Sequence, residues 1–171
     1  KMQATLKKMV KFSGMGLHSG APVRLEIHPA PANHGIVFRR TDLQPVVDIP
    51  ALWDHVTPSK LCTLMDDGKG TTLSTVEHIM AALVGTGIHN ALVTVDGPEV
   101  PILDGSSAPF VDGILRAGID MQNATLRAIR VLRPVEVREG EAFARLEPAD
   151  HLQIDFAIDF VDAAIGHQEK R

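Results

Sequence analysis

The sequence has little cysteine, no long apolar run and no block of like charge. Cys62 is the only cysteine among 171 residues, so no disulfide can form within the chain and a reducing compartment is the simpler expectation. No stretch approaches the roughly 18 apolar residues of a membrane span, and the first residues, from Lys1 to Thr5, lack the apolar core of a signal peptide. We therefore expect a cytoplasmic protein with no membrane span.

The charge balance also excludes a common class of partner. Lysine and arginine number 17 against 21 aspartate and glutamate residues, which gives a formal net charge of −4. Without a basic surface there is no electrostatic basis for binding a phosphate backbone, so no nucleic-acid partner is expected. Hydrophobic residues make up 44% of the chain and charged residues 22%, which is typical of a folded globular protein.

Hydrophobic periodicity predicts several strands and two helices in the first part of the chain. Helical spacing occurs at Leu73–Val84, closed by Gly85 to Gly87, and at Ala108–Ala117, closed by Gly118. Strands with two helices predict the α+β class, as a two-layer α/β sandwich domain with a small sheet plus two helices. The predicted strands are Thr5–Phe12, Val23–His28, Gly35–Arg39, Lys60–Met65 and Ala91–Val95.

A second block of strands follows a short polar stretch. Residues 120–123 predict a linker, and the β-rich runs Ile129–Val137, Phe143–Leu146 and Leu152–Phe160 predict three antiparallel strands. No helix accompanies these strands, so one apolar sheet face would remain uncovered. We expect a first domain over residues 1–124, and the N-terminal strands of a truncated second, similar domain over residues 125–171.

The densest chemistry lies at the start of the first predicted helix, in Ser74-Thr75-Val76-Glu77-His78. One interpretation is a capping box, in which Ser74 is the N-cap and Glu77 returns a hydrogen bond to it. The other interpretation is a metal site. Met80 lies near the centre of the predicted apolar face, and His78 points about 160° away from it, so its side chain would face away from the core. A helix N-terminus also favours the neutral imidazole that binds metals. Spacing alone leaves both open.

A catalytic zinc site normally needs three protein ligands and an open position. No His-Glu-x-x-His or Cys-x-x-Cys pair is present to complete a site around His78. The other histidines are dispersed, and a surface or hydrogen-bonded role is the simpler interpretation of each. They are His18, His28, His34, His55, His89, His151 and His167.

Two glycine-containing segments predict turns rather than ligand loops. Residues 14–20 contain Gly-x-Gly but no third glycine opening a helix, which favours a tight turn between strands over a dinucleotide loop. In residues 101–110, Asp104-Gly105 predicts another turn, and Pro109 suits the first turn of the second helix. No nucleophilic serine is implied.

Taken together, these residues resemble a known family, the UDP-3-O-acyl-N-acetylglucosamine deacetylase of lipid A biosynthesis. The similar segments keep their order and spacing from near residue 5 to Phe160. They are Thr5-Leu6-Lys7, Gly14-Met15-Gly16-Leu17-His18-Ser19-Gly20, Pro29-Ala30-Pro31-Ala32, Phe38-Arg39-Arg40-Thr41-Asp42-Leu43, Ser74-Thr75-Val76-Glu77-His78, Gly87-Ile88-His89-Asn90 and Pro98-Glu99-Val100-Pro101-Ile102-Leu103-Asp104-Gly105-Ser106.

The resemblance implies a zinc-dependent N-deacetylase with two related domains and an active site between them. It implies that His78 binds Zn²⁺ and that Glu77 is the general base. The expected partners are a UDP-linked acylated glucosamine substrate and the missing C-terminal part of the second domain. The resemblance also places five residues at the substrate cleft, namely Leu17, His18, Leu61, Cys62 and Thr63.

The chain departs from the family pattern in two ways. The His-Lys-x-x-Asp motif that supplies the family's other two zinc ligands does not occur, and Asp162-Ala163 stands where the family usually has His-Pro. The first departure predicts that this chain is inactive alone, as a fragment that lacks the remaining ligands. The alternative hypothesis is a non-enzymatic α+β binding module.

Overall fold

The computed structural model describes residues 1–171, which form two compact units, Lys1–Leu126 (unit 1) and Arg127–Arg171 (unit 2). Both α-helices belong to unit 1, whereas unit 2 contains only strands and connecting segments. This combination of many strands, several sheets and two helices confirms the α+β class. Each helix has ten residues, and neither has the length and apolar character needed to cross a membrane.

A five-stranded sheet is the largest element of unit 1. Its strand order is β2-β3-β9-β4-β5, in which β4 and β9 are parallel and all other neighbours are antiparallel. Side chains alternate between the two faces of a strand, and in β9 the alternation buries Ala91, Val93 and Val95. The strands are β2 Val10–Met15, β3 Pro22–Pro29, β4 Ile36–Arg40, β5 Val47–Pro50 and β9 Ala91–Val95.

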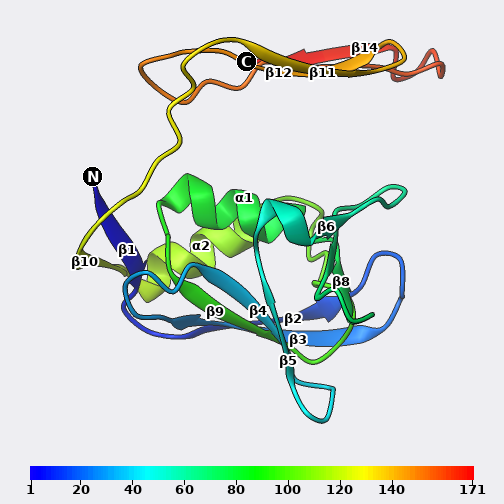
Figure 1. Ribbon diagram of the computed structural model, residues 1–171. Helices are drawn as coiled ribbons and strands as arrows, with labels where there is room; N and C mark the ends of the chain where they lie inside the picture. The colour runs from blue at the N-terminus through cyan, green and yellow to red at the C-terminus, as the bar shows by residue number, and fades with distance from the viewer. The chain divides into compact units, whose positions relative to one another are not determined.

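The helices α1 (Glu77–Thr86) and α2 (Ala108–Ala117) lie on the same side of this sheet (Figure 1). Their apolar side chains and one face of the sheet enclose the core. Each helix ends at a glycine with positive φ. Gly87 has the left-handed conformation expected of a C-cap, with φ 77° and ψ 26°, whereas Gly118 has φ 83° but a ψ of 155°, outside that conformation. The largest fully buried core side chains include Leu25, Ile27, Phe38, Ile79, Leu83, Val93, Phe110 and Ile114.

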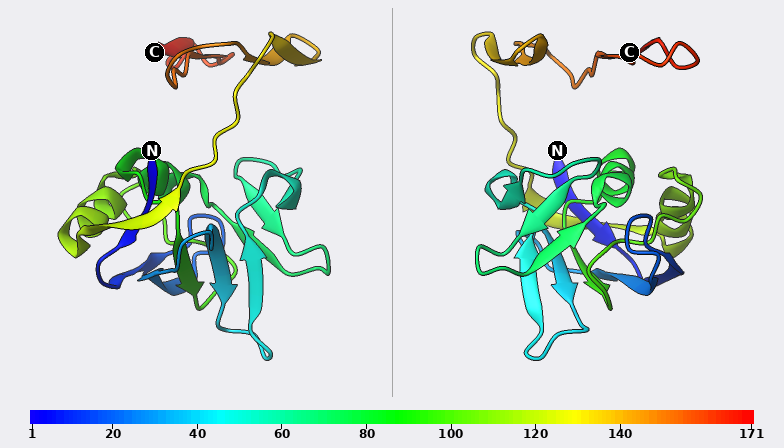
Figure 2. Two further views of the ribbon diagram at one scale, coloured as in Figure 1. Left: turned by 60° about the vertical axis from the view of Figure 1, so that its left-hand side comes forward. Right: turned by 90° about the vertical axis from the view of Figure 1, so that its right-hand side faces the viewer.

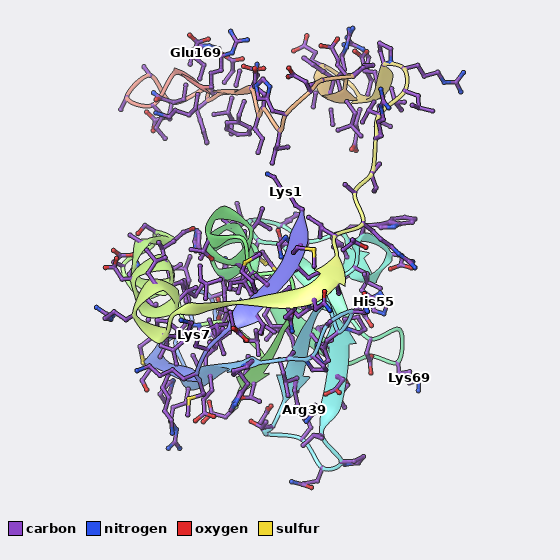
Figure 3. All side chains as sticks on the ribbon, turned by 90° about the vertical axis from the view of Figure 1, so that its left-hand side faces the viewer. Lys1, Lys7, Arg39, His55, Lys69 and Glu169 are labelled. Carbon is purple, nitrogen blue, oxygen red and sulfur yellow. The ribbon has the colours of Figure 1, made fainter.

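Unit 1 also contains two smaller sheets, whose strands can be followed by colour in Figure 2. Strands β1 (Met2–Leu6) and β10 (Ile119–Thr125) pair antiparallel. A short 3₁₀ helix, Trp53–His55, precedes a three-stranded sheet, and Figure 3 shows Lys69 at the tip of a loop of that sheet. Its strands are β6 Val56–Thr57, β7 Leu64–Asp66 and β8 Thr72–Ser74.

Unit 2 consists of two antiparallel hairpins. The first joins β11 (Val135–Glu139) to β12 (Ala142–Leu146), and the second joins β13 (Phe156–Asp159) to β14 (His167–Lys170). All residues of these strands are exposed. The exposed apolar side chains include Val135, Val137, Phe143, Leu146, Phe156 and Ile158.

The predicted start of the first helix is wrong. Helix α1 begins at Glu77, because residues 72–74 pair with β7 as a strand and Thr75 has a positive φ of 61°. The N-cap residue is Val76, and no side chain caps the helix, so the expected capping box of Ser74 and Glu77 is not formed. An amphipathic pattern can continue across a strand and a helix when both face the same core. The sequence pattern therefore does not mark the boundary between β8 and α1.

The predicted core face of this helix also needs correction. The helical spacing predicts Leu73, Val76, Met80, Leu83 and Val84 on one apolar face. In the structure the buried residues of α1 are Ile79, Ala82 and Leu83, whereas Val84 is 61% exposed. At about 100° per residue, His78 therefore lies at the flank of the buried face rather than opposite to it. The position still leaves the imidazole accessible, since His78 is only partly buried.

Several other predicted elements differ from the structure because tertiary pairing overrides local pattern. The run Thr5–Phe12 is divided between β1 and β2, which belong to different sheets, and residues 60–63 precede β7 rather than belong to it. The expected linker at 120–123 lies within β10, where it pairs with β1. In unit 2, residues 129–134 and 152–155 are not in strands, and four strands replace the predicted three.

Candidate active site

The connection between β8 and α1 is strained at one residue. Thr75 is 2% exposed and has a φ of 61°, a left-handed conformation that is unusual for a β-branched side chain. Its backbone N–H donates to the carbonyl oxygen of Thr63 at 3.0 Å. Strain of this kind costs on the order of 1–3 kcal/mol and persists only where surrounding contacts enforce it. The contacts around Thr75 therefore determine how the chain enters α1.

Glu77, the first residue of α1, is fixed from the same neighbouring segment. Its Oε2 atom accepts a hydrogen bond from the backbone N–H of Thr63 at 3.2 Å. Thr63 thus uses its carbonyl for Thr75 and its N–H for Glu77. A carboxylate in the first turn of a helix is also favoured by the helix dipole, by about 0.3–1 kcal/mol. The Glu77 carboxylate is half-buried and keeps acceptor sites that this single bond does not use.

A second carboxylate, Glu99, contacts Thr75 and is 2% exposed. Its Oε1 atom accepts from the Thr75 hydroxyl at 2.9 Å and from the His18 backbone N–H at 3.0 Å. Its Oε2 atom accepts from the Ser19 backbone N–H at 2.8 Å. The Nδ1 atom of His18 also lies 3.0 Å from Oε1. Glu99 therefore joins the glycine-rich turn to the segment that precedes α1.

The electrostatic state of Glu99 follows from these contacts. Burial alone raises the pKa of its carboxyl group, but hydrogen bonds from His18, Ser19 and Thr75 outweigh burial and lower the pKa from 4.5 to about 2. Hydrogen bonds to a charged acceptor contribute roughly 1.5–3 kcal/mol each. The bond from Thr75 is thus large enough to offset the strain at that residue.

His78 follows Glu77 in the first turn of α1 and is partly buried. In the turn before α2, hydrogen bonds from the hydroxyl and the backbone N–H of Ser106 lower the pKa of the Asp104 carboxyl group. No group of three or more His, Cys, Asp or Glu side chains within residues 1–171 is arranged to hold a metal ion. A catalytic zinc site typically uses three protein ligands.

Comparison with known proteins decides the family. Residues 3–171 match the model of the LpxC family, UDP-3-O-acyl N-acetylglycosamine deacetylase. The chain belongs to the LpxC family. Its curated relatives named UDP-3-O-acyl-N-acetylglucosamine deacetylase include one from Idiomarina loihiensis, 50% identical over 96% of this chain, and one from Vibrio parahaemolyticus, 48% identical over 99%.

The LpxC match covers nearly all of this chain but only part of each relative. The aligned residues make up 54% of the Idiomarina loihiensis protein and 55% of the Vibrio parahaemolyticus protein. A relative from Shewanella pealeana, 46% identical over 98% of this chain, is covered to 55%. The chain thus spans about half the length of the curated relatives it matches.

The structure brings two of the residues predicted for an LpxC site, Thr63 and Glu77, into contact. Thr63 contacts Glu77, and His18 contacts Glu99, as described above. Leu17 and Leu61 are 59% and 91% exposed.

Cys62 precedes Thr63 and is half-buried, and its Sγ atom lies 3.3 Å from the hydroxyl of Ser59. Its role at the substrate cleft stays a prediction, as do those of the other four residues.

Sequence reasoning assigned no role to Glu99 or to the conformation of Thr75. The available signal for Glu99 was its position between Pro98 and Val100, in a segment with few other charges. A glutamate in such a run is rarely buried unless it is paired or hydrogen-bonded. No local signal predicts a left-handed threonine, because threonine normally avoids this conformation.

Proposed function

We propose that residues 1–171 contribute the general base and one metal ligand to a zinc-dependent hydrolase. The reaction is removal of acetate from the N-acetyl group of UDP-3-O-acyl-N-acetylglucosamine, a step of lipid A biosynthesis. One observation carries the proposal: Glu77 and His78 are consecutive at the start of α1, next to a strained residue, in a chain that matches the LpxC family over residues 3–171.

Glu77 is the proposed general base. Cleavage of an amide by water requires a group that takes a proton from the attacking water, and a carboxylate within hydrogen-bond reach can do so. The bond from the Thr63 N–H orients Glu77 through one oxygen and leaves the other oxygen free to accept that proton. Strain at the neighbouring Thr75 supports this assignment, because such strain is concentrated at active sites.

His78 is the proposed zinc ligand from this chain, and the cofactor is Zn²⁺. The partly exposed imidazole at the flank of α1 is available to a metal ion. Because residues 1–171 supply no group of three ligands, we propose that the other ligands lie outside these residues. Bound zinc would supply Lewis-acid polarisation of the amide carbonyl.

The remaining assignments follow from the family. We propose that residues 1–124 are a first, two-layer domain and that residues 125–171 are the opening strands of a second similar domain. The apolar side chains exposed on β11 and β12 support a further covering layer. The proposed location is the cytoplasm. The residues proposed to line the substrate cleft are Leu17, His18, Leu61, Cys62 and Thr63.

An acetate-release assay tests this function. The assay uses a protein of the relatives' length that contains this sequence, called the full-length form below, with UDP-3-O-acyl-N-acetylglucosamine as substrate. We expect zinc-dependent release of acetate and of the free amine. Absence of release, when the Idiomarina loihiensis protein is active in the same assay, would contradict the proposal and favour the non-enzymatic binding module.

A further inference from the structure

The direction of α1 depends on a very short connection. Ser74 is held by two backbone hydrogen bonds, one from its N–H to the Pro98 carbonyl at 3.0 Å and one from the Val100 N–H to its carbonyl at 3.1 Å. Helix α1 begins three residues later, at Glu77. Between these fixed points, the backbone angles of Thr75 and Val76 alone set the direction in which the helix leaves β8.

The Glu99 carboxylate is the side chain that holds Thr75. The Thr75 hydroxyl donates to it at 2.9 Å, inside the protein, where a carboxylate needs every hydrogen bond that it receives. Neither conformational preference nor helix propensity favours a left-handed threonine. If this bond is removed, the Thr75 hydroxyl keeps only a longer contact, 3.3 Å, with the Nδ1 atom of His18.

The Glu99 carboxylate is also anchored, through both of its oxygens, in the turn between β2 and β3. The backbone N–H groups of His18 and Ser19 both donate to Glu99. A Cβ atom on Gly16 would lie 2.3 Å from Oε2 of Glu99 and 2.1 Å from the Ser19 hydroxyl. The glycine therefore leaves the space that the carboxylate occupies, and the turn fixes the position from which Glu99 holds Thr75.

We propose that Glu99 is a positioning residue for the deacetylase reaction, whose buried carboxylate holds Thr75 in the left-handed conformation and so sets the direction in which α1 presents Glu77 and His78. This inference rests on the proposed function. The alternative is a local role, in which Glu99 stabilises only the turn between β2 and β3 and has no effect on the direction of α1.

Amide hydrogen exchange in the 171-residue chain separates the two roles without any assay of activity. Glu99→Gln keeps the size of the side chain but places an NH₂ group among donors. The Thr63 amide donates to the Glu77 carboxylate, and the Thr75 amide donates to the Thr63 carbonyl. In Glu99→Gln we expect hydrogen exchange at both amides to accelerate by about tenfold or more. Rates within about twofold of the wild type at both amides would overturn the proposal.

Two further variants complete this measurement. Thr75→Val removes the hydroxyl that donates to Glu99 and that lies 3.3 Å from His18 Nδ1, and this variant provides the test if Glu99→Gln does not fold. Thr5→Val is the control, since Thr5 is buried and hydrogen-bonded to Asn90 and Ala30, far in the chain from the β8–α1 connection. We expect Thr5→Val to destabilise unit 1 without selective acceleration at Thr63 and Thr75. Selective acceleration in the control would also contradict the proposal.

Kinetics of the full-length form test the consequence for catalysis. Misplacement of a catalytic group lowers kcat, so we expect Glu99→Gln to lower kcat roughly 10- to 100-fold with KM within about threefold. Glycine adopts positive φ without steric cost, so adding Thr75→Gly to the Glu99→Gln variant should raise kcat again by about threefold or more.

A loss of kcat that Thr75→Gly does not relieve, or a loss only in KM, would overturn the positioning role. If the wild-type full-length form releases no acetate, the proposed function fails, while the exchange measurement still decides whether Glu99 holds Thr75.

Discussion

Two carboxylates near Thr75, Glu77 and Glu99, have different surroundings, which suit them to different tasks. Glu99 is buried and accepts hydrogen bonds from three residues, which lower its pKa to about 2 and keep it ionised. Glu77 is half-buried and accepts one bond, from the Thr63 N–H. A carboxylate with free acceptor sites suits proton transfer, whereas a saturated one suits the fixing of geometry.

Glu77→Gln in the full-length form is expected to abolish most activity with little loss of stability. The amide oxygen of glutamine can still accept from the Thr63 N–H, but it cannot take a proton from water. Loss of a general base typically lowers kcat by 10²–10⁴-fold, and the lost helix-dipole interaction costs only about 0.3–1 kcal/mol. Steady-state kinetics on zinc-loaded protein, with thermal melting as control, measures both. Activity within about threefold of the wild type would remove Glu77 from the mechanism.

The depressed pKa of Glu99 predicts a specific dependence of stability on pH. Between about 2 and 4.5 the unfolded state binds a proton at this position that the folded state does not. The contribution of Glu99 is therefore complete above the unfolded value of 4.5 and is lost as the pH falls towards about 2. The difference in unfolding free energy between wild type and Glu99→Gln should narrow over this window.

Urea unfolding of the 171-residue chain, followed by circular dichroism of the helices, measures this difference because both helices belong to unit 1. Carboxylates such as Asp42 and Asp48, whose pKa values are also lowered, are common to both proteins and cancel in the comparison. Thr5→Val is the pH-independent control. A difference that stays constant from neutral pH to about 3 would contradict the assigned ionisation of Glu99.

At the scale of elements, α1 and α2 use glycine in opposite ways. Gly85 in α1 is exposed, and a Cβ atom there would meet no atom within 4 Å. Gly113 in α2 is buried, and a Cβ atom there would lie 2.5 Å from the ring of Phe12. That ring packs against Phe110 with centroids 4.9 Å apart, so it cannot move away freely. Glycine is needed for packing in α2 but not in α1.

Alanine at these two positions should therefore change stability in opposite directions. Gly85→Ala gains helix propensity of up to about 1 kcal/mol with no steric cost. Gly113→Ala gains the same propensity but overfills the contact with Phe12, at a cost of about 1–3 kcal/mol, so a net loss is expected. Thermal melting of both variants under one set of conditions checks the signs. Stabilisation by Gly113→Ala would show that α2 can shift on the sheet more easily than the packing indicates.

The elements that were predicted correctly are those whose local pattern and tertiary context agree. Ala91–Val95 and Ala108–Ala117 have the predicted bounds, because each is flanked by residues that stop its own type of structure. The start of α1 was predicted four residues too early, since the strand pairing of Leu73 depends on β7, which local periodicity does not contain. The Glu99 contacts join residues 81 and 24 positions apart, and spacing rules do not reach across such separations.

At the scale of the whole molecule, the chain presents a folded unit 1 and a set of exposed hairpins in unit 2. Unit 1 encloses a continuous core, whereas all strand residues of unit 2 are exposed. Two-stranded hairpins are at best marginally stable in water without a covering layer. Both this exposure and the lack of a three-ligand group support the proposal that the chemistry of the LpxC match uses residues in addition to 1–171.

Comparison of the 171-residue chain with the full-length form tests most directly whether the zinc site needs ligands from outside residues 1–171. Zinc content after dialysis and acetate release from UDP-3-O-acyl-N-acetylglucosamine are measured for both. We predict that the full-length form retains stoichiometric zinc and releases acetate, whereas the 171-residue chain retains only weakly bound metal and releases none, because it supplies one ligand of the usual three. Stoichiometric zinc in the 171-residue chain, with turnover near that of the full-length form, would contradict the proposal that residues 1–171 supply only one zinc ligand.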